Sequence, residues 1–123
     1  MTELATSSNY VLNKGLTSRI LTPSLVVFRD KVSHNINTMI AAMDRNPLRW
    51  RPHVKTVKSP ALIRELVRAG VRKFKCATPR EARELCKVLT AEGVAAASDV
   101  LVAFPHTGAN LQLVGAVRCS RWW

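Results

Sequence analysis

The stretch VRKFKCATPREAREL, residues 71–85, decides the fold class. Its first half, Val71 to Ala77, predicts a short strand. Its second half opens with Thr78-Pro79-Arg80-Glu81, a capping box with proline at the first helical position, so a helix begins at once. The apolar stripe of that helix consists of Ala82, Leu85, Cys86 and Leu89. The stretch therefore predicts a strand that leads through a tight turn into an amphipathic helix.

A second unit of the same kind lies just before it. Apolar and polar residues alternate over 49–54, which predicts a strand, although Pro52 weakens that assignment. A helix follows, capped at Ser59 and ended by Gly70. Lys55 lies in the loop between this strand and this helix.

The pattern continues outward in both directions. SLVVF, Ser24 to Phe28, is rich in β-branched and aromatic residues and predicts a strand, and a helix is expected from Asp30 to about Arg45. On the other side, residues 100–104 predict an apolar strand, and Thr107 to about Val114 predicts another helix.

Strands that alternate with helices indicate an α/β fold with parallel strands joined by crossover connections. Periodicity leaves two architectures open, a layered open sheet and a closed (β/α) barrel. In both, ligands bind at the carboxyl ends of the strands, in the loops that lead into helices. Lys55 lies in one of these loops.

The composition is that of a folded protein, with 47% hydrophobic and 22% charged residues in 123. Neither a long apolar run nor a secretory signal is present, so we expect a cytoplasmic protein with no membrane contact. The cysteines, Cys76, Cys86 and Cys119, are odd in number and form no CxxC pair, which argues against disulfides and zinc. We expect reduced thiols, with Cys76 and Cys86 in the core.

The formal net charge of +11 is concentrated in the middle of the chain. Residues 45–87 hold thirteen lysines and arginines against three acids. Such a region attracts anions, which can be nucleic acid, a phosphorylated cofactor or an acidic partner. The basic residues are spread over several expected elements and no nucleic-acid-binding motif is present, which disfavours nucleic acid.

Lys55 is the main candidate for chemistry. Neighbouring loops can desolvate a lysine at the carboxyl end of a strand, and nearby cations such as Arg51 and Lys58 further favour the neutral amine. A neutral amine attacks aldehydes, and an imine of this kind is how pyridoxal phosphate is held. The alternative is an exposed lysine in a basic loop.

Four strings of the chain resemble one enzyme group. TPSLVVFRDKVSHNINTM, RPHVKTVKSP, CATPREAREL and DVLVAFPHTGANL, which together cover roughly residues 22–113, are similar to the N-terminal part of the D-threonine aldolase and D-serine dehydratase group. That group belongs to the alanine-racemase-like (fold type III) pyridoxal-phosphate enzymes. The Arg-Pro-His-x-Lys-Thr string is the specific part of the resemblance, and the other strings support it.

The resemblance implies a fold and a division into domains. The fold is an incomplete (β/α)8 TIM barrel of the alanine racemase N-terminal type, with about three barrel strands near 49–54, 72–77 and 100–104. The Ser24–Phe28 strand would contribute to a separate β-rich domain. The expected division is an N-terminal extension over 1–21, the partial barrel over 22–114, and a tail over 115–123 that does not continue the family pattern.

The resemblance also implies a site and a reaction. Lys55 would form the imine with pyridoxal 5'-phosphate, and His53 and Thr56 would lie beside the cofactor. The substrates would be D-3-hydroxyamino acids, cleaved by a dehydratase or an aldolase reaction. The full-length relatives would be homodimers that also use a divalent metal, whose ligands are absent from this chain.

Two departures from the family pattern limit this interpretation. Val57 stands where the family commonly has histidine, and the chain stops near the third barrel strand, so we expect a truncated enzyme that is inactive at this length. The alternative is a non-catalytic basic module that binds nucleic acid or an acidic partner. His106 follows the third barrel strand and is a weaker candidate than Lys55 for contact with the ligand. His34 is expected to lie on a solvated helix face. Trp50 is expected to pack under its strand.

Overall fold

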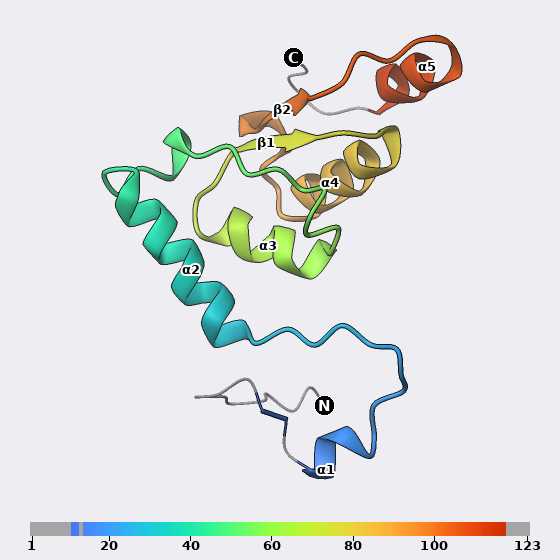
Figure 1. The fold of residues 1–123 in the computed structure, drawn as a ribbon. Helices are drawn as coiled ribbons and strands as arrows, with labels where there is room; N and C mark the ends of the chain where they lie inside the picture. The colour runs from blue at the N-terminus through green and yellow to red at the C-terminus, as the bar shows by residue number, and fades with distance from the viewer. Residues whose placement is uncertain (1–10, 13, 118–123) are drawn as a thin grey trace.

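The computed structural model describes residues 11–12 and 14–117, which form a mixed α/β fold with a small parallel sheet (Figure 1). Its elements in chain order are α1 (Lys14–Thr17), α2 (Arg29–Ala42), the 3-10 turn η1 (Pro47–Arg49), α3 (Pro60–Arg68), β1 (Lys73–Cys76), α4 (Pro79–Ala91), the 3-10 turn η2 (Ala95–Ala97), β2 (Asp99–Val102) and α5 (Gly108–Ala116). The α/β class expected from the sequence is thus confirmed.

The sheet is built around β1. Strand β2 pairs with it in parallel, in a register that runs from Lys73 opposite Asp99 to Cys76 opposite Val102. On the other edge of β1, His53 forms a single parallel bridge to Lys75. The order across the sheet is therefore the His53 segment, β1 and β2, which is also their order in the chain.

The strand expected over 49–54 shrinks to this one bridge. The Val54 amide donates to the Lys75 carbonyl at 2.9 Å, and the Lys75 amide donates to the Pro52 carbonyl at 3.0 Å. Extending the ladder by one further pair would require an N–H group on Pro52, which proline lacks. The expectation of a full strand was wrong because Pro52 removes that donor, and η1 begins the segment instead.

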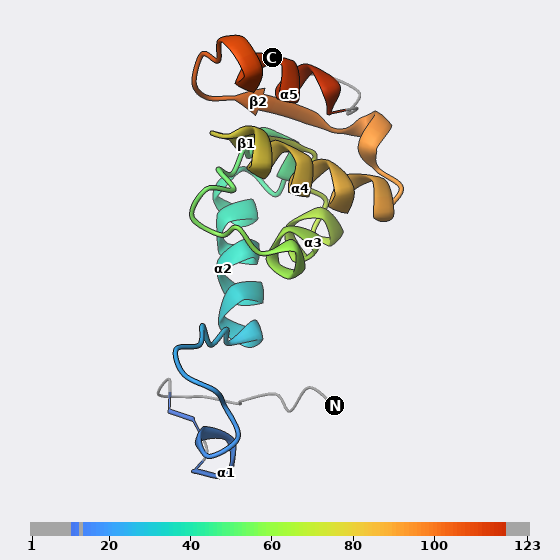
Figure 2. The same cartoon turned by 90° about the vertical axis from the view of Figure 1, so that its right-hand side faces the viewer.

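The strand expected over Ser24–Phe28 is also absent. No described strand lies beside these residues, and Leu25 is 82% exposed. In Figures 1 and 2 the segment runs away from the rest of the fold as the link between α1 and α2. Strand composition alone forms no ladder, because a ladder needs a second strand alongside, and neither strand of the described residues takes that place.

The helices match the expected ones closely. Gly70 ends α3 with a φ of 93°, and the Gly70 and Val71 amides donate to the Val67 and Leu66 carbonyls, the hydrogen-bond pattern of a glycine-terminated helix. Helix α2 differs at its start, because Phe28 rather than Asp30 occupies the N-cap position.

The core lies between the sheet and one layer of helices. Phe74, Cys76 and Val100 on the sheet pack against α3 and α4, while Ile36 is the buried residue that α2 contributes. The helical side chains of this core are Ile63, Leu66, Val67, Ala82, Leu85, Val88 and Leu89. Helix α4 contacts both α3 and α5, so it lies between them (Figure 2).

The expected burial of two cysteines is confirmed. Cys76 and Cys86 are both buried, while Cys119 lies outside the described residues, as do residues 118–123 of the expected tail. Within the described residues, every helix is too short or too polar to cross a bilayer.

Candidate functional site

The candidate site lies at the edge of the sheet where the parallel strands end. The His53 segment, β1 and β2 run in the same direction, so their carboxyl ends share that edge. Lys55 follows the first of these ends, Thr78 the second and His106 the third. The structure therefore brings to one edge three loops that are distant in the sequence.

Lys55 lies in a tight turn. The Val54 carbonyl accepts hydrogen bonds from the amides of Val57 at 3.1 Å and Lys58 at 2.9 Å. The buried side chain of Val54 anchors the turn to the core, and Lys58 has a positive φ of 43°. This geometry leaves the side chains of Lys55 and Thr56 exposed.

His53 contacts this turn directly. Its Nδ1 atom accepts a hydrogen bond from the Lys55 amide at 3.2 Å, which places the proton of a neutral ring on Nε2. Partial burial lowers the pKa of His53 below its usual value, and the charges of Lys55 and Lys75 lower it further, against an opposing effect of Glu81. His53 is therefore neutral at neutral pH and acts as an acceptor toward the lysine loop.

Thr56 faces back toward the main chain. Its hydroxyl donates to the His53 carbonyl at 3.4 Å, close to the upper limit for a hydrogen bond. All three residues expected at the site, His53, Lys55 and Thr56, thus lie in one turn, and hydrogen bonds link each neighbour to the segment that carries Lys55.

The electrostatic surroundings of Lys55 differ from the expected ones. Arg51 forms a bidentate ion pair with Asp99 at 2.6 and 3.0 Å, and the Lys58 amine lies 3.8 Å from a Glu81 carboxylate oxygen. Arg51 and Lys58, the two cations expected near Lys55, are thus each paired with a carboxylate. Lys55 itself is exposed, so the expected desolvation by neighbouring loops is not present in the described part of the chain.

Glu81 holds the end of β1 in place. Its side chain is 8% exposed and accepts a hydrogen bond from the Ala77 amide at 2.8 Å, while its own amide donates to the Thr78 hydroxyl at 3.2 Å. The capping box expected from Thr78 to Glu81 is present in a slightly shifted form, because the carboxylate bonds to the residue before the N-cap. Glu81 thereby connects the start of α4, the end of β1 and the Lys58 amine.

His106 is held at the same edge. Its Nε2 atom lies 3.1 Å from the Ala77 carbonyl, to which it donates in the matching tautomer. His34 is exposed on α2, as expected. Trp50 is half-buried against the core, also as expected.

Sequence reasoning missed the roles of Lys75 and Asp99 and the pairing of Glu81 with Lys58. Lys75 lies on the same sheet face as His53, because paired residues of a parallel ladder point to the same side. The sequence held one usable signal, the alternation of lysine with Phe74 and Cys76 in β1. The Arg51–Asp99 pair joins residues 48 positions apart and had no local signal.

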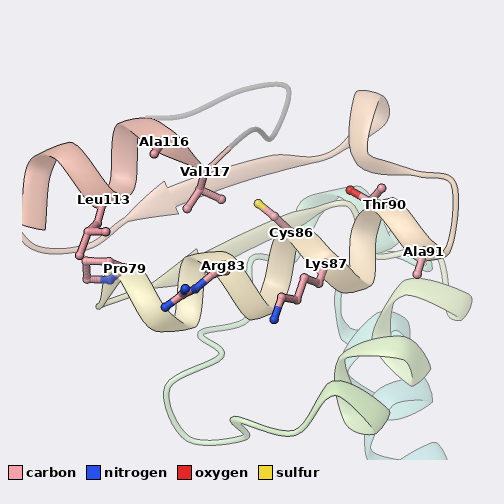
Figure 3. Close-up of a pocket in the computed structure, with 9 residues that line it drawn as sticks. All are labelled: Pro79, Arg83, Cys86, Lys87, Thr90, Ala91, Leu113, Ala116 and Val117. Carbon is pink, nitrogen blue, oxygen red and sulfur yellow. The ribbon is translucent and has the colours of Figure 1, made fainter.

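Two hollows of the described residues lie beside this edge rather than on it. One of about 620 Å³ lies between the first turns of α3 and α4, where Lys58, Thr78 and Glu81 line it. Another, of about 560 Å³, lies between α4 and α5 (Figure 3). There Cys86 points toward Val117, whereas the nitrogen atoms of Arg83 and Lys87 point away from α5. Neither hollow includes Lys55, so the geometry of the strand ends defines the candidate site better than cavity size does.

Comparison of the chain with family profiles, with curated proteins and with solved structures finds no match in any of the three. Within residues 11–12 and 14–117, no three His, Cys, Asp or Glu side chains gather closely enough to hold a metal ion.

Proposed function

We propose that the chain is the N-terminal part of a pyridoxal-phosphate-dependent lyase that acts on D-3-hydroxyamino acids, of the D-serine dehydratase or D-threonine aldolase type. Lys55 is the proposed attachment point of the cofactor. The observation that carries the proposal is the position of Lys55, directly after the segment that pairs with β1 and at the carboxyl edge of the sheet. Ligand sites of α/β folds lie at this edge.

The residues present fit the aldehyde end of this cofactor. The Lys55 side chain is exposed, and no carboxylate of the described residues forms an ion pair with it. An amine with these properties can reach an aldehyde from solution. Lys55 would hold the cofactor covalently, with His53 and Thr56 beside it.

The chain's own groups have separable roles in this proposal. When bound, pyridoxal phosphate supplies a ring that accepts electrons released at the substrate's α-carbon. The Lys55 amine binds the cofactor and, once the substrate's amine has replaced it, moves a proton as a base. His53 fixes the main chain of Lys55 through Nδ1, and its neutral state adds no positive charge beside the amine.

The arrangement of helices supports a barrel as the parent fold. Strand order follows chain order, and α4 contacts both α3 and α5, so successive helices follow one another on one side of the sheet. A closed (β/α) barrel repeats this arrangement. We therefore propose that the described residues correspond to the first barrel units of the longer enzyme.

Reductive labelling tests the proposal. After incubation of the full chain with pyridoxal phosphate and reduction with borohydride, peptide mapping should find Lys55 labelled several-fold more than any other lysine. The matched control is Lys58→Arg, which removes another exposed amine of the same turn and should leave the Lys55 label unchanged. Labelling spread over many lysines, or unaltered by Lys55→Arg, would contradict the proposal.

A basic sheet face supports a second candidate, a module that binds an acidic partner or nucleic acid. Lys73 and Lys75 lie on the sheet face opposite Phe74 and Cys76, and that face is not covered by α3 or α4. Binding to a polyanion that weakens steeply with added salt, and weakens further in Lys73→Gln, would favour this candidate.

A further inference from the structure

The sheet face opposite α3 and α4 carries a row of charged side chains near the amino ends of its strands. Lys73 lies directly opposite Asp99 in the parallel register of β1 and β2. The two carboxylate oxygens of Asp99 accept hydrogen bonds from the guanidinium group of Arg51 at 2.6 and 3.0 Å. Positive and negative charges therefore meet in this first row.

The second row, nearer the carboxyl ends of the strands, has no acidic member. Lys75 lies opposite His53 on one side and opposite Leu101 on the other. Paired residues point to the same face of a sheet, and neighbouring strands are roughly 5 Å apart, so the side chains of His53 and Lys75 are neighbours. None of the ion pairs among the described residues includes Lys75. The second row thus holds a positive charge with which no carboxylate of the described residues pairs.

Glu81 is close enough to act on the charge of His53, but its carboxylate is held by other groups. One of its oxygens accepts a hydrogen bond from the Ala77 amide at 2.8 Å, and the other lies 3.8 Å from the Lys58 amine. The carboxylate therefore connects the start of α4 with the lysine turn and does not pair with Lys75.

His53 adds a hydrogen-bond donor to the second row. Its Nδ1 atom accepts from the Lys55 amide, so a neutral ring carries its proton on Nε2. Nε2 has no hydrogen-bond partner among the described residues, and each buried side-chain nitrogen of those residues does have one, so Nε2 is open to solvent. An N–H group and an ammonium group thus lie side by side on this face, and both can donate to an anion.

We propose that Lys75 and His53 form a binding site for a small oxyanion, a carboxylate or a phosphate group, on the sheet face opposite the helices. The Lys75 ammonium group supplies charge, and His53 donates a hydrogen bond from Nε2. The exposed Lys55 amine, which follows His53 in the turn, adds further positive charge. Hydrogen bonds from charged donors to oxyanions are stronger than those between neutral groups. The site does not depend on an imine at Lys55, because neither Lys75 nor His53 takes part in that bond.

The proposed parent barrel is compatible with a ligand on this face. The helices of a closed barrel cover the outside of its strands, and the opposite face of each strand points to the interior. Here the helices cover the face of Phe74 and Cys76, so Lys75 would face the interior, next to the carboxyl ends of the strands. Completing the barrel would therefore enclose the site without placing a helix over it.

Nuclear magnetic resonance of the histidine rings of the full chain tests the proposal. Sodium phosphate is added in one titration and sodium acetate in another, both at constant pH and constant ionic strength, so that general screening stays the same. The His53 signal should shift to saturation with at least one anion, and the anion that binds more tightly identifies the source of the oxyanion. The exposed His34 ring on α2 is the internal control and should not shift.

A pair of variants separates a defined site from a diffuse basic surface. Lys75→Gln should weaken anion binding by roughly fivefold or more, because it removes a charged donor. Lys73→Gln makes the same change of charge on the same strand and face, one row away, and should weaken binding by less than about twofold. Lys75→Arg keeps the charge and should bind nearly as well as the natural chain.

The pKa of His53 gives a second measurement. Burial lowers the pKa of His53, the charges of Lys55 on its own segment and Lys75 on β1 lower it further, and Glu81 on α4 raises it. An anion bound beside Lys75 favours the protonated ring, so the pKa of His53 should be higher in phosphate or acetate than in chloride. The increase should be smaller in Lys75→Gln.

Three outcomes would overturn the proposal. They are a His53 signal that neither anion moves, equal weakening in Lys75→Gln and Lys73→Gln, and a pKa of His53 that is the same with and without the bound anion. Borohydride labelling of Lys55 is a separate measurement on another residue. Failure of the oxyanion site and failure of the proposed cofactor attachment can therefore be told apart.

Discussion

Residues 54–100 and the segments on either side of them use their apolar side chains in opposite ways. Among the described residues, all buried hydrophobic side chains except Ile36 lie within 54–100. The large exposed hydrophobic side chains lie outside this range, from Val11 to Leu48 on one side and from Phe104 to Leu113 on the other. The middle of the chain therefore forms the core, and its ends present apolar surface to solvent.

This contrast has a physical origin in the layers. Helices α3 and α4 cover one face of β1 and β2. The apolar side chains of the middle of the chain are therefore buried between these helices and the sheet. The flanking segments have the same kinds of residues, but within residues 11–12 and 14–117 no further layer covers them. Exposed apolar surface of this kind marks places where other protein surface can bind.

Replacing one phenylalanine from each region gives the largest expected difference. Phe74 is fully buried in β1, so Phe74→Ala should lower the free energy of unfolding by about 3–5 kcal/mol. Phe104 is 57% exposed, so Phe104→Ala should change it by less than about 0.5 kcal/mol. Urea unfolding followed by circular dichroism measures both, and equal losses would refute the division into the two regions.

Two glutamates of α4 sharpen the comparison at the edge of the core. Glu81→Ala leaves the Ala77 amide without its acceptor and should lower the free energy of unfolding by about 1–3 kcal/mol. The Glu84 side chain is 41% exposed and pairs with Lys87, so Glu84→Ala should change the free energy of unfolding by no more than about 0.5 kcal/mol.

Glu81→Gln serves as the control for the role of the acceptor. Its amide oxygen can still accept from the Ala77 amide, so this variant should lose less stability than Glu81→Ala in the same urea titration. A loss as large as that of the alanine variant would show that the charge, rather than the acceptor, holds the end of β1.

The smallest expected effect is the pH dependence that His53 contributes at the boundary of the two regions. The pKa of His53 is lowered in the folded state, so below its usual value near 6.5 the unfolded chain binds more protons than the folded chain. The free energy of unfolding should therefore fall as the pH falls from 6.5 toward the folded-state pKa. The loss should be below about 1 kcal/mol, because water reaches part of the ring.

Urea titrations at several pH values measure this effect. His53→Gln should remove part of the slope, whereas His34→Gln, at an exposed position of α2, should keep the slope of the natural chain. A His53→Gln variant with an unchanged slope would show that other groups cause the acid sensitivity.

Lys55 belongs to the boundary between the two regions. Val54 beside it is buried in the core, while Lys55 and Thr56 are exposed. A rigid anchor next to an accessible amine is a suitable arrangement for a residue that binds a ligand. The position of the amine depends on the core, and its accessibility depends on the absence of covering side chains in the described part of the chain.

Local signals were sufficient for the elements of the middle region. The capping residues Thr78 and Gly70 and the prolines at the starts of α3 and α4 predicted both helices, and both lie where they were expected. Strands β1 and β2 were also expected close to their observed positions. These elements were predictable because caps and helix breakers act within a few residues.

The errors occurred where strand formation depended on a neighbour. Ser24–Phe28 has strand composition, but no strand of the described residues lies beside it, and Pro52 limits the segment around it to the single bridge at His53. The loop position of Lys55 was predicted, but the pairing of Arg51 with Asp99 and of Lys58 with Glu81 was not. A pairing between distant residues has no signature in local sequence.

By itself the sequence determined the α/β class, the helix boundaries of the middle region and the presence of a lysine after the first sheet segment, because these follow from caps, turns and short-range periodicity. Only the tertiary structure decided which strands find partners, which cations meet carboxylates and which apolar side chains stay exposed. These outcomes depend on contacts between residues far apart in the chain, and such contacts exist only once the layers have packed.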